Sequence, residues 1–121
     1  MRYFLFSEFD QKGLQGSGQD FMDNLFVSRL DALRHTCGFP FIITSGYRTP
    51  EYNNQVSTTG YTGPHTTGKA ADIQVSRGNA YIVLREALNM GCFTGIGINQ
   101  KGDDRFIHLD SIVGANRLWS Y

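Results

Sequence analysis

The sequence is poor in cysteine, proline and tryptophan. Its 121 residues include two cysteines, three prolines and one tryptophan. Cys37 and Cys92 form no Cys-x-x-Cys pair, so neither a disulfide framework nor a cysteine-based zinc site is indicated. Free thiols are favoured over a single bridge between them, because disulfides are rare in reducing compartments.

The chain also lacks an excess of charge of either sign and any long apolar run. Eleven lysines and arginines balance eleven aspartates and glutamates, which argues against a nucleic-acid partner. No apolar run approaches the roughly 20 residues that span a bilayer, so no membrane insertion is expected. The first eight residues are too short and too soon acidic for a secretory signal, which predicts synthesis in the cytoplasm.

Apolar residues and glycine, by contrast, are abundant. Hydrophobic residues make up 40% of the chain, which excludes a disordered protein. The length fits one compact domain, so we treat residues 1–121 as a single unit. The 14 glycines predict many tight turns around short elements.

The spacing of apolar residues predicts two helices and four short strands. The helices are expected at about 20–36 and 79–90, and the strands at 41–44, 69–75, 95–98 and 106–110. Phe21 and Leu25 are expected on the buried face of the first helix, and Leu88 on that of the second. Residues 3–9 fit a strand or a packed arm, and 51–68 fit a surface loop. The predicted fold class is α+β, with two main helices packed on a small, largely antiparallel sheet.

Two of the three histidines lie close to predicted strands that carry acids. His65 precedes the strand that contains Asp72, and His108 lies inside the last strand. Because side chains alternate along a strand, His108 and Asp110 share one face. A charged Asp72 in an apolar strand is costly unless it is paired or bound to a cation. His35 instead falls in the last turn of the first helix, where a cation suits the helix dipole.

Two imidazoles and one carboxylate, with a fourth position open to water, are a known ligand set for catalytic zinc. Zinc lowers the pKa of its bound water toward about 7, which makes hydroxide available at neutral pH. The spacing alone equally fits a buried Asp–His pair beside a surface histidine in a metal-free α+β domain. That alternative stays open at this point.

Several blocks of the sequence, taken together, resemble one known family. They read Ser45-Gly-Tyr-Arg-Thr-Pro, His65-x-x-Gly-x-Ala-Ala-Asp72-Ile, Phe106-Ile-His108-Leu-Asp110 and Arg117-x-Trp119. The chain is similar to the zinc D-Ala-D-Ala carboxypeptidase family of lysostaphin-, carboxypeptidase- and hedgehog-type metallopeptidases. Its closest likeness is to the small branch of phage endolysins and bacterial murein endopeptidases. The likeness covers about residues 40–119, and the conjunction of the blocks carries it.

The resemblance implies a zinc ion held by His65, Asp72 and His108. It implies that Arg48 lies beside the metal and polarises the scissile carbonyl, a task that suits a permanently charged guanidinium. The substrate would be the peptide stem or crosslink of bacterial peptidoglycan, cut by a carboxypeptidase or an endopeptidase. Such a chain would act at the cell wall or periplasm, with a phage or prophage origin. It would reach the wall through a holin-type lesion or within a virion.

One position departs from the family pattern. Many members carry Glu or Asp three residues before the last histidine as general base, and here that residue is Arg105. Asp110 is favoured instead, either as the base or as a group that orients a ligand. Asp104, in the preceding turn, is the alternative. If no carboxylate serves, the chain would be a catalytically inactive metal-binding module, for example a structural or targeting component of a phage tail.

Aromatic and polar side chains near these blocks are candidates for the lining of a peptide groove. They are Tyr47, Tyr52, Tyr61 and Trp119, together with Gln55, Ser57 and Thr58. Ordinary packing in the core or at its rim is the alternative for each aromatic residue.

Overall fold

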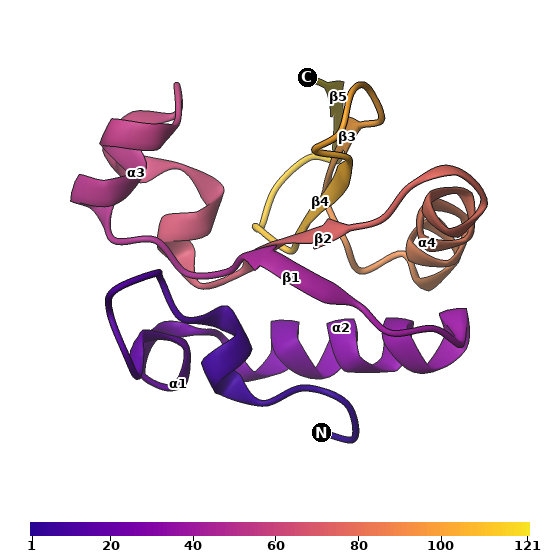
Figure 1. Cartoon of the computed structure of the whole chain (residues 1–121), viewed down its shortest axis with the longest axis horizontal. Helices are drawn as coiled ribbons and strands as arrows, with labels where there is room; N and C mark the ends of the chain where they lie inside the picture. Colours follow the sequence, from indigo (N-terminus) through magenta and orange to yellow (C-terminus); the bar gives the residue numbers. More distant parts are fainter.

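The computed structural model describes residues 1–121 as a five-stranded sheet covered by helices on both faces (Figure 1). The strands are β1 (Ile42–Ser45), β2 (Ala70–Gln74), β3 (Gly95–Asn99), β4 (Phe106–Asp110) and β5 (Arg117–Ser120). They lie in the order β1-β2-β4-β3-β5. All neighbouring strands are antiparallel except β3 and β5, which are parallel. The predicted α+β fold with a largely antiparallel sheet is confirmed.

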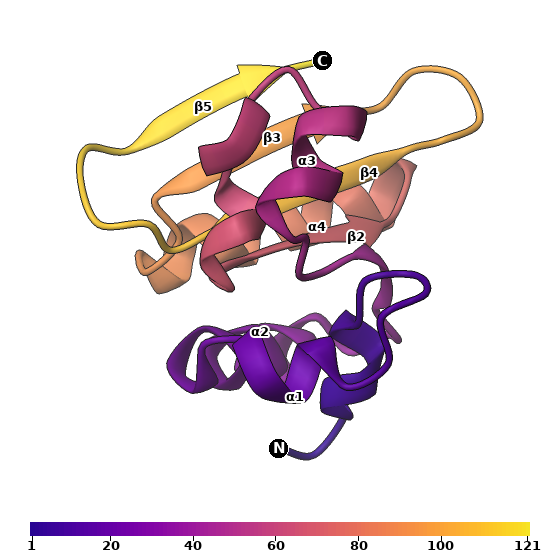
Figure 2. The same ribbon diagram turned by 90° about the vertical axis from the view of Figure 1, so that its left-hand side faces the viewer.

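Four α-helices and three short 3₁₀ turns complete the chain. The helices are α1 (Ser17–Phe21), α2 (Asn24–Cys37), α3 (Pro50–Val56) and α4 (Arg77–Met90), and the turns are η1 (Phe6–Phe9), η2 (Gly60–Thr62) and η3 (Pro64–Thr67). Figure 2 shows α3 in front of the sheet, α4 behind it, and α1 and α2 in a layer below. None of the helices is long and apolar enough to cross a membrane.

The core lies between the sheet and the two long helices. We call the sheet face that carries Ile73, Ile107 and Leu109 the core face, because all three side chains are at least 99% buried there. Helices α2 and α4 cover this face with an apolar set that includes Phe26, Val27, Leu30, Leu33, Val83 and Ala87. The half-buried Cys37 and Cys92 pack against this core as free thiols.

The first predicted helix is wrong in one respect, because the chain breaks it in two. Asp23 is extended and caps α2 by accepting a hydrogen bond from the Phe26 amide at 2.9 Å. A side-chain cap requires this non-helical backbone, so the preceding turn ends as α1. Phe21 and Leu25 are consequently 53% and 57% exposed rather than buried. Leu88 of α4 is also exposed, contrary to the prediction.

One α-helix and one strand were not predicted from the sequence. Helix α3 occupies the first residues of the predicted loop at 51–68; Thr49 caps it by accepting from the Tyr52 amide at 3.1 Å, and Pro50 occupies its first turn. Strand β5 lies in the C-terminal tail and pairs with β3 alone. At the other end of the chain, residues 3–9 form a packed arm with a 3₁₀ turn rather than a strand.

Candidate active site

The polar side chains of the site form a row across the sheet, on the face opposite the core. Asp72 of β2 lies opposite His108 of β4, His108 lies opposite Gly97 of β3, and Gly97 lies opposite Trp119 of β5. Because side chains alternate along each strand, these residues point away from the face that carries Ile73. We call their side of the sheet the site face.

The absence of a side chain at Gly97 lets a β5 residue reach a β4 residue across β3. A Cβ at position 97 would stand 2.6 Å from the indole of Trp119, closer than van der Waals contact permits. The Trp119 ring instead lies over this bare backbone, with its centroid 5.1 Å from that of the His108 ring. The tryptophan thereby forms a wall beside this histidine.

Gly95, two residues earlier on β3, likewise lets a β5 residue reach a β4 residue, here Arg117 and Asp110. A Cβ there would overlap the carboxylate of Asp110. Arg117 of β5 crosses this gap and forms an ion pair with Asp110 Oδ1. The Ile112 amide also donates to Oδ1, at 3.3 Å, while Oδ2 faces His108 Nε2 at 2.8 Å. Both carboxylate oxygens are therefore occupied.

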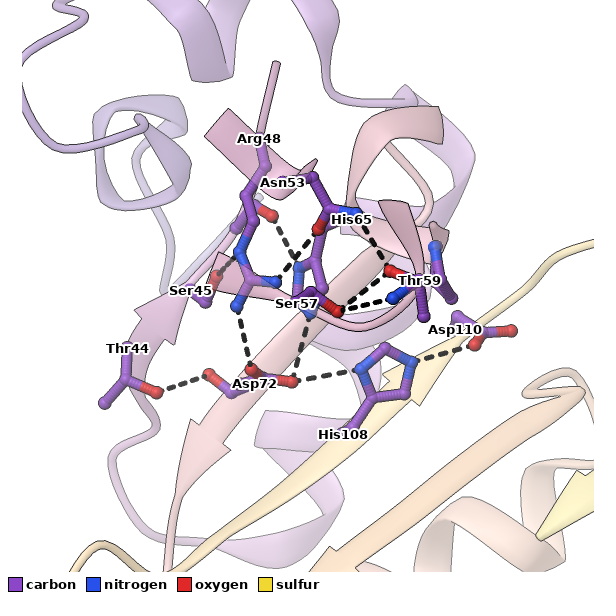
Figure 3. Close-up of polar contacts among 12 residues, drawn as sticks. Thr44, Ser45, Arg48, Asn53, Ser57, Thr59, His65, Asp72, His108 and Asp110 are labelled. Atoms are coloured by element: carbon purple, nitrogen blue, oxygen red, sulfur yellow. Dashed lines mark hydrogen bonds and ion pairs between the residues drawn. The ribbon is translucent and has the colours of Figure 1, made fainter. Parts of the chain in front are cut away.

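His65, Asp72 and His108 meet at the floor of the site (Figure 3). Asp72 Oδ1 lies 3.3 Å from His65 Nε2 and 3.0 Å from His108 Nδ1. All three residues are buried, and one potential ligand atom from each lies within 4.8 Å of the others. The structure thus brings together the three residues that the resemblance marked as metal ligands.

In each imidazole, the ring nitrogen that does not face Asp72 is hydrogen-bonded to another part of the protein. His65 Nδ1 lies 2.8 Å from the Gly46 carbonyl oxygen, and His108 Nε2 faces the Asp110 carboxylate. Both partners can only accept, so each of these nitrogens carries a proton. His65 Nε2 and His108 Nδ1 face Asp72: in a protonated imidazole they donate to its carboxylate, and in a neutral one they offer a lone pair to a metal ion. Two such nitrogens and one carboxylate fit the ligand preferences of zinc, and the supporting hydrogen bonds are those that orient metal-binding histidines.

The charges in the site favour ionised carboxylates. Burial alone would raise the pKa of Asp72, but hydrogen bonds from His108 and His65 outweigh burial and lower it. Burial would lower the pKa of His108, but hydrogen bonds to Asp110 and Asp72 reverse the direction and raise it. The pKa of Asp110 is lowered, because His108 and Arg117 together outweigh the effect of burial. Both acids therefore remain acceptors at neutral pH.

Arg48 lies beside this group, where β1 leads into α3. Its Nη2 is 3.9 Å from Asp72 Oδ2, and its backbone amide donates to the His65 carbonyl oxygen at 3.1 Å. The two candidate bases differ in exposure. Asp110 is fully buried, whereas Asp104 is exposed and borders a hollow of about 320 Å³ that Arg48 and Asp72 also line.

A cleft of about 650 Å³ opens over the three central residues. Its walls are formed by α3, the segment that follows α3, and the last two strands of the chain. The lining residues outside the central group are Arg48, Val56, Ser57, Thr58, Thr59, Pro64, Phe106, Arg117, Trp119, Ser120 and Tyr121. Trp119, Ser57 and Thr58 thus lie where the groove was predicted. Tyr47 is buried and stacks on Phe21 at 4.7 Å, while Tyr52, Tyr61 and Gln55 lie outside the lining.

Some residues of the site were missed by sequence reasoning. Asn53, which contacts Arg48, was missed because α3 was taken for a loop, although Thr49 followed by Pro50 is a recognisable helix start. The partnership of Arg117 with Asp110 was also missed. The alternation Gly-Ile-Gly-Ile at 95–98 indicates a strand with no side chains on one face. It does not indicate which side chains of other strands lie over that face.

The fold and the cleft define the class: an α+β domain with a buried His-Asp-His group beside an arginine, an arrangement suited to a metal-dependent hydrolase. Residues 5–110 match the model of the family Peptidase M15, and the chain belongs to that family. The resemblance to zinc D-Ala-D-Ala carboxypeptidases is thereby confirmed, and members of this family are metallopeptidases, typically of zinc. A comparison with curated proteins found no match.

Proposed function

We propose that this chain is a zinc-dependent peptidase that hydrolyses a bond in the peptide stem or crosslink of bacterial peptidoglycan. The observation that carries the proposal is the buried group of His65, Asp72 and His108 under an open cleft, with Arg48 beside it, in a peptidase M15 chain. The likeness of its sequence blocks to those of murein peptidases supports the bacterial cell wall as the source of the substrate.

His65 through Nε2, His108 through Nδ1 and the Asp72 carboxylate would hold the zinc ion. When bound, zinc supplies a Lewis acid and lowers the pKa of a water molecule to about 7. The chain contributes the buried setting and the hydrogen bonds that keep both imidazoles in the required tautomer.

Arg48 would bind the oxygen of the scissile carbonyl. Its guanidinium is permanently charged and lies at the edge of the cleft next to Asp72. Donors that are fixed before the reaction stabilise the negative charge that develops on this oxygen, without reorganisation at that moment. Loss of one such donor typically costs about 10²–10³ in kcat.

The two acids divide between proton transfer and orientation. Asp110 is assigned to the orientation of His108, because both of its oxygens are occupied and it is fully buried. Asp104 is assigned to proton transfer, because it is exposed in a hollow that Asp72 also lines. Asp104→Asn should lower kcat by about 10²–10⁴, the usual range for a general base, while the neighbouring Asp103→Asn should change it little.

A second candidate function is a metal-binding module without hydrolytic activity. The observation that favours it is Arg105, which stands where many family members carry the catalytic acid. This candidate predicts full metal binding with no release of peptides from purified cell wall, for wild type and for Asp104→Asn alike.

The test begins with the zinc content of tag-free protein, measured by elemental mass spectrometry. We expect one zinc per wild-type chain, its loss in His108→Ala, and its retention in the control His35→Ala, since His35 is exposed on α2. Cobalt offers a second readout, because the only tryptophan lies beside His108 and its fluorescence should be quenched when Co²⁺ binds. Digestion of purified cell wall, with mass spectrometry of the products, then identifies the bond that is cut. Wild-type protein that takes up no zinc would overturn the proposal.

A further inference from the structure

Asn53 is a completely buried polar side chain at the centre of α3. It is 0% exposed, and burial of an amide is costly unless its hydrogen bonds are satisfied. Its Oδ1 accepts from Arg48 Nη1 at 3.1 Å, and its Nδ2 donates to Thr59 Oγ1 at 2.8 Å and to the Gly60 carbonyl at 2.5 Å. The orientation of the amide is unambiguous, because an arginine can only donate and a carbonyl can only accept.

These contacts hold two nitrogens of the Arg48 guanidinium and turn the third toward Asp72 in the cleft. Nε donates to Ser45 Oγ at 3.0 Å and Nη1 donates to Asn53, so two bonds to different nitrogens fix the plane of the group. The third nitrogen, Nη2, faces the Asp72 carboxylate at 3.9 Å (Figure 3). A free arginine side chain loses rotamer entropy when it is ordered, and these bonds remove much of that freedom in advance.

The other end of the same amide holds the cleft wall. Thr59 also hydrogen-bonds Ser57, with 2.9 Å between the two hydroxyl oxygens. The chain then passes so close that a Cβ at Gly63 would stand 2.6 Å from Asn53 Nδ2. One side chain therefore connects Arg48 with the later segment 57–63, whose first residues line the same cleft.

We propose that Asn53 is a positioning residue that holds Arg48 in the orientation needed at the scissile carbonyl. The inference rests on the proposed function of Arg48. Asn53 itself does not touch the substrate in this scheme; it acts through the guanidinium. Misplacement of a reacting group by about 1 Å can cost on the order of 10²-fold in rate, which sets the scale of the expected effect.

A double-mutant cycle tests the inference with zinc-loaded protein and a soluble crosslinked muropeptide. Asn53→Ala should lower kcat by about ten- to a hundredfold with a smaller change in KM. In an Arg48→Ala background the same substitution should lower kcat by less than about twofold, because the residue through which it acts is absent. Asn54→Ala is the matched control, since Asn54 is exposed on the same helix. Equal effects of Asn53→Ala in the two backgrounds would overturn the inference.

A spectroscopic measurement keeps the inference testable if the protein is inactive, and a second variant, Asn53→Asp, keeps it testable if Asn53→Ala does not fold. The Arg48 Nε–H group should give a sharp NMR cross-peak in wild-type protein, assigned by its loss in Arg48→Lys, because Ser45 protects it from exchange. The peak should broaden in Asn53→Ala and persist in Asn53→Asp, which keeps an acceptor for Nη1. Absence of the peak in wild type, or its loss in Asn53→Asp, would overturn the inference. If Arg48→Ala leaves kcat unchanged, the proposed function of Arg48 fails instead.

Discussion

The core face and the site face belong to the same strands, yet different forces hold them. On the core face, Ile73, Ile107 and Leu109 are buried against helices by apolar contact, which has no preferred direction. On the site face, Asp72 and His108 are also buried but are held by directional hydrogen bonds. Alternation along one strand therefore separates the residues that stabilise the fold from those suited to chemistry.

The two faces of the sheet are also covered by different kinds of segment. The core face is covered by two long helices that each present a stripe of apolar residues. The site face is completed by short segments: the exit from β1, the turn η3 that carries His65, and the strand β5 with Arg117 and Trp119. Substitutions on the two faces should accordingly separate stability from metal binding.

The largest difference is expected between the neighbouring residues Asp72 and Ile73. Ile73→Ala should reduce the free energy of unfolding by about 2–5 kcal/mol, because it leaves a cavity in the core. The folded fraction of this variant should still bind one zinc. Asp72→Ala should lose zinc, including in the fraction of the protein that stays folded. Denaturant unfolding of metal-free protein and zinc analysis of the folded protein check the pair, and loss of zinc in folded Ile73→Ala would contradict the comparison.

The next effect concerns the bare surface of β3. Gly97→Ala should destabilise the protein by about 1–3 kcal/mol, because the added methyl group overlaps the Trp119 indole. Gly78→Ala is the matched control: Gly78 lies in the first turn of α4 with nothing within 4 Å of the added Cβ, so alanine should stabilise the protein slightly, by less than about 1 kcal/mol. Thermal unfolding followed by the fluorescence of the single tryptophan measures both. Equal signs for the two substitutions would show that Trp119 does not lie across Gly97.

A smaller effect is expected for Asp110, which contacts the His108 nitrogen that faces away from Asp72. Asp110→Asn should weaken zinc binding by about 10–100-fold, the usual cost of losing a group that orients a metal-binding histidine. The carboxamide keeps the shape of the side chain but loses the charge that both His108 and Arg117 use. Competition with a chelator measures the affinity, with the exposed Asp103→Asn as control. An unchanged affinity in Asp110→Asn would remove this residue from the metal site.

The smallest effect is expected for Asp31 of α2, which is hydrogen-bonded outside the site. Burial would raise the pKa of Asp31, but hydrogen bonds from the amides of Arg2 and Tyr3 outweigh it and lower the pKa. A lowered pKa means that this stabilisation is present above the unfolded value near 3.8 and is lost as the pH falls through the folded value. The melting temperature of Asp31→Asn should therefore lie below that of wild type at pH 7, and the two should converge below about pH 4. A constant difference across this range would contradict the assignment.

Much of the fold could be predicted from local patterns, and the errors have identifiable causes. Strands β1 to β4 and helix α4 were predicted because apolar periodicity reflects burial on one face. The break between α1 and α2 was missed because Asp23 ends one helix and caps the next within a continuous apolar pattern. Strand β5 was missed because its residues are mostly exposed and it pairs with one neighbour only.

By itself the sequence predicted the fold class and pointed to His65, Asp72 and His108, the three residues that the structure brings together. Apolar periodicity is a local property, and motifs such as Ser45 to Arg48 and His65 to Asp72 are contiguous along the chain. Only the tertiary structure decided that Asp110 lies behind His108 rather than in the cleft, that Arg117 pairs with it across a glycine, and that Asn53 holds Arg48. Hydrogen bonds depend on distance and direction between side chains, and those relations exist only once the strands and helices have packed together.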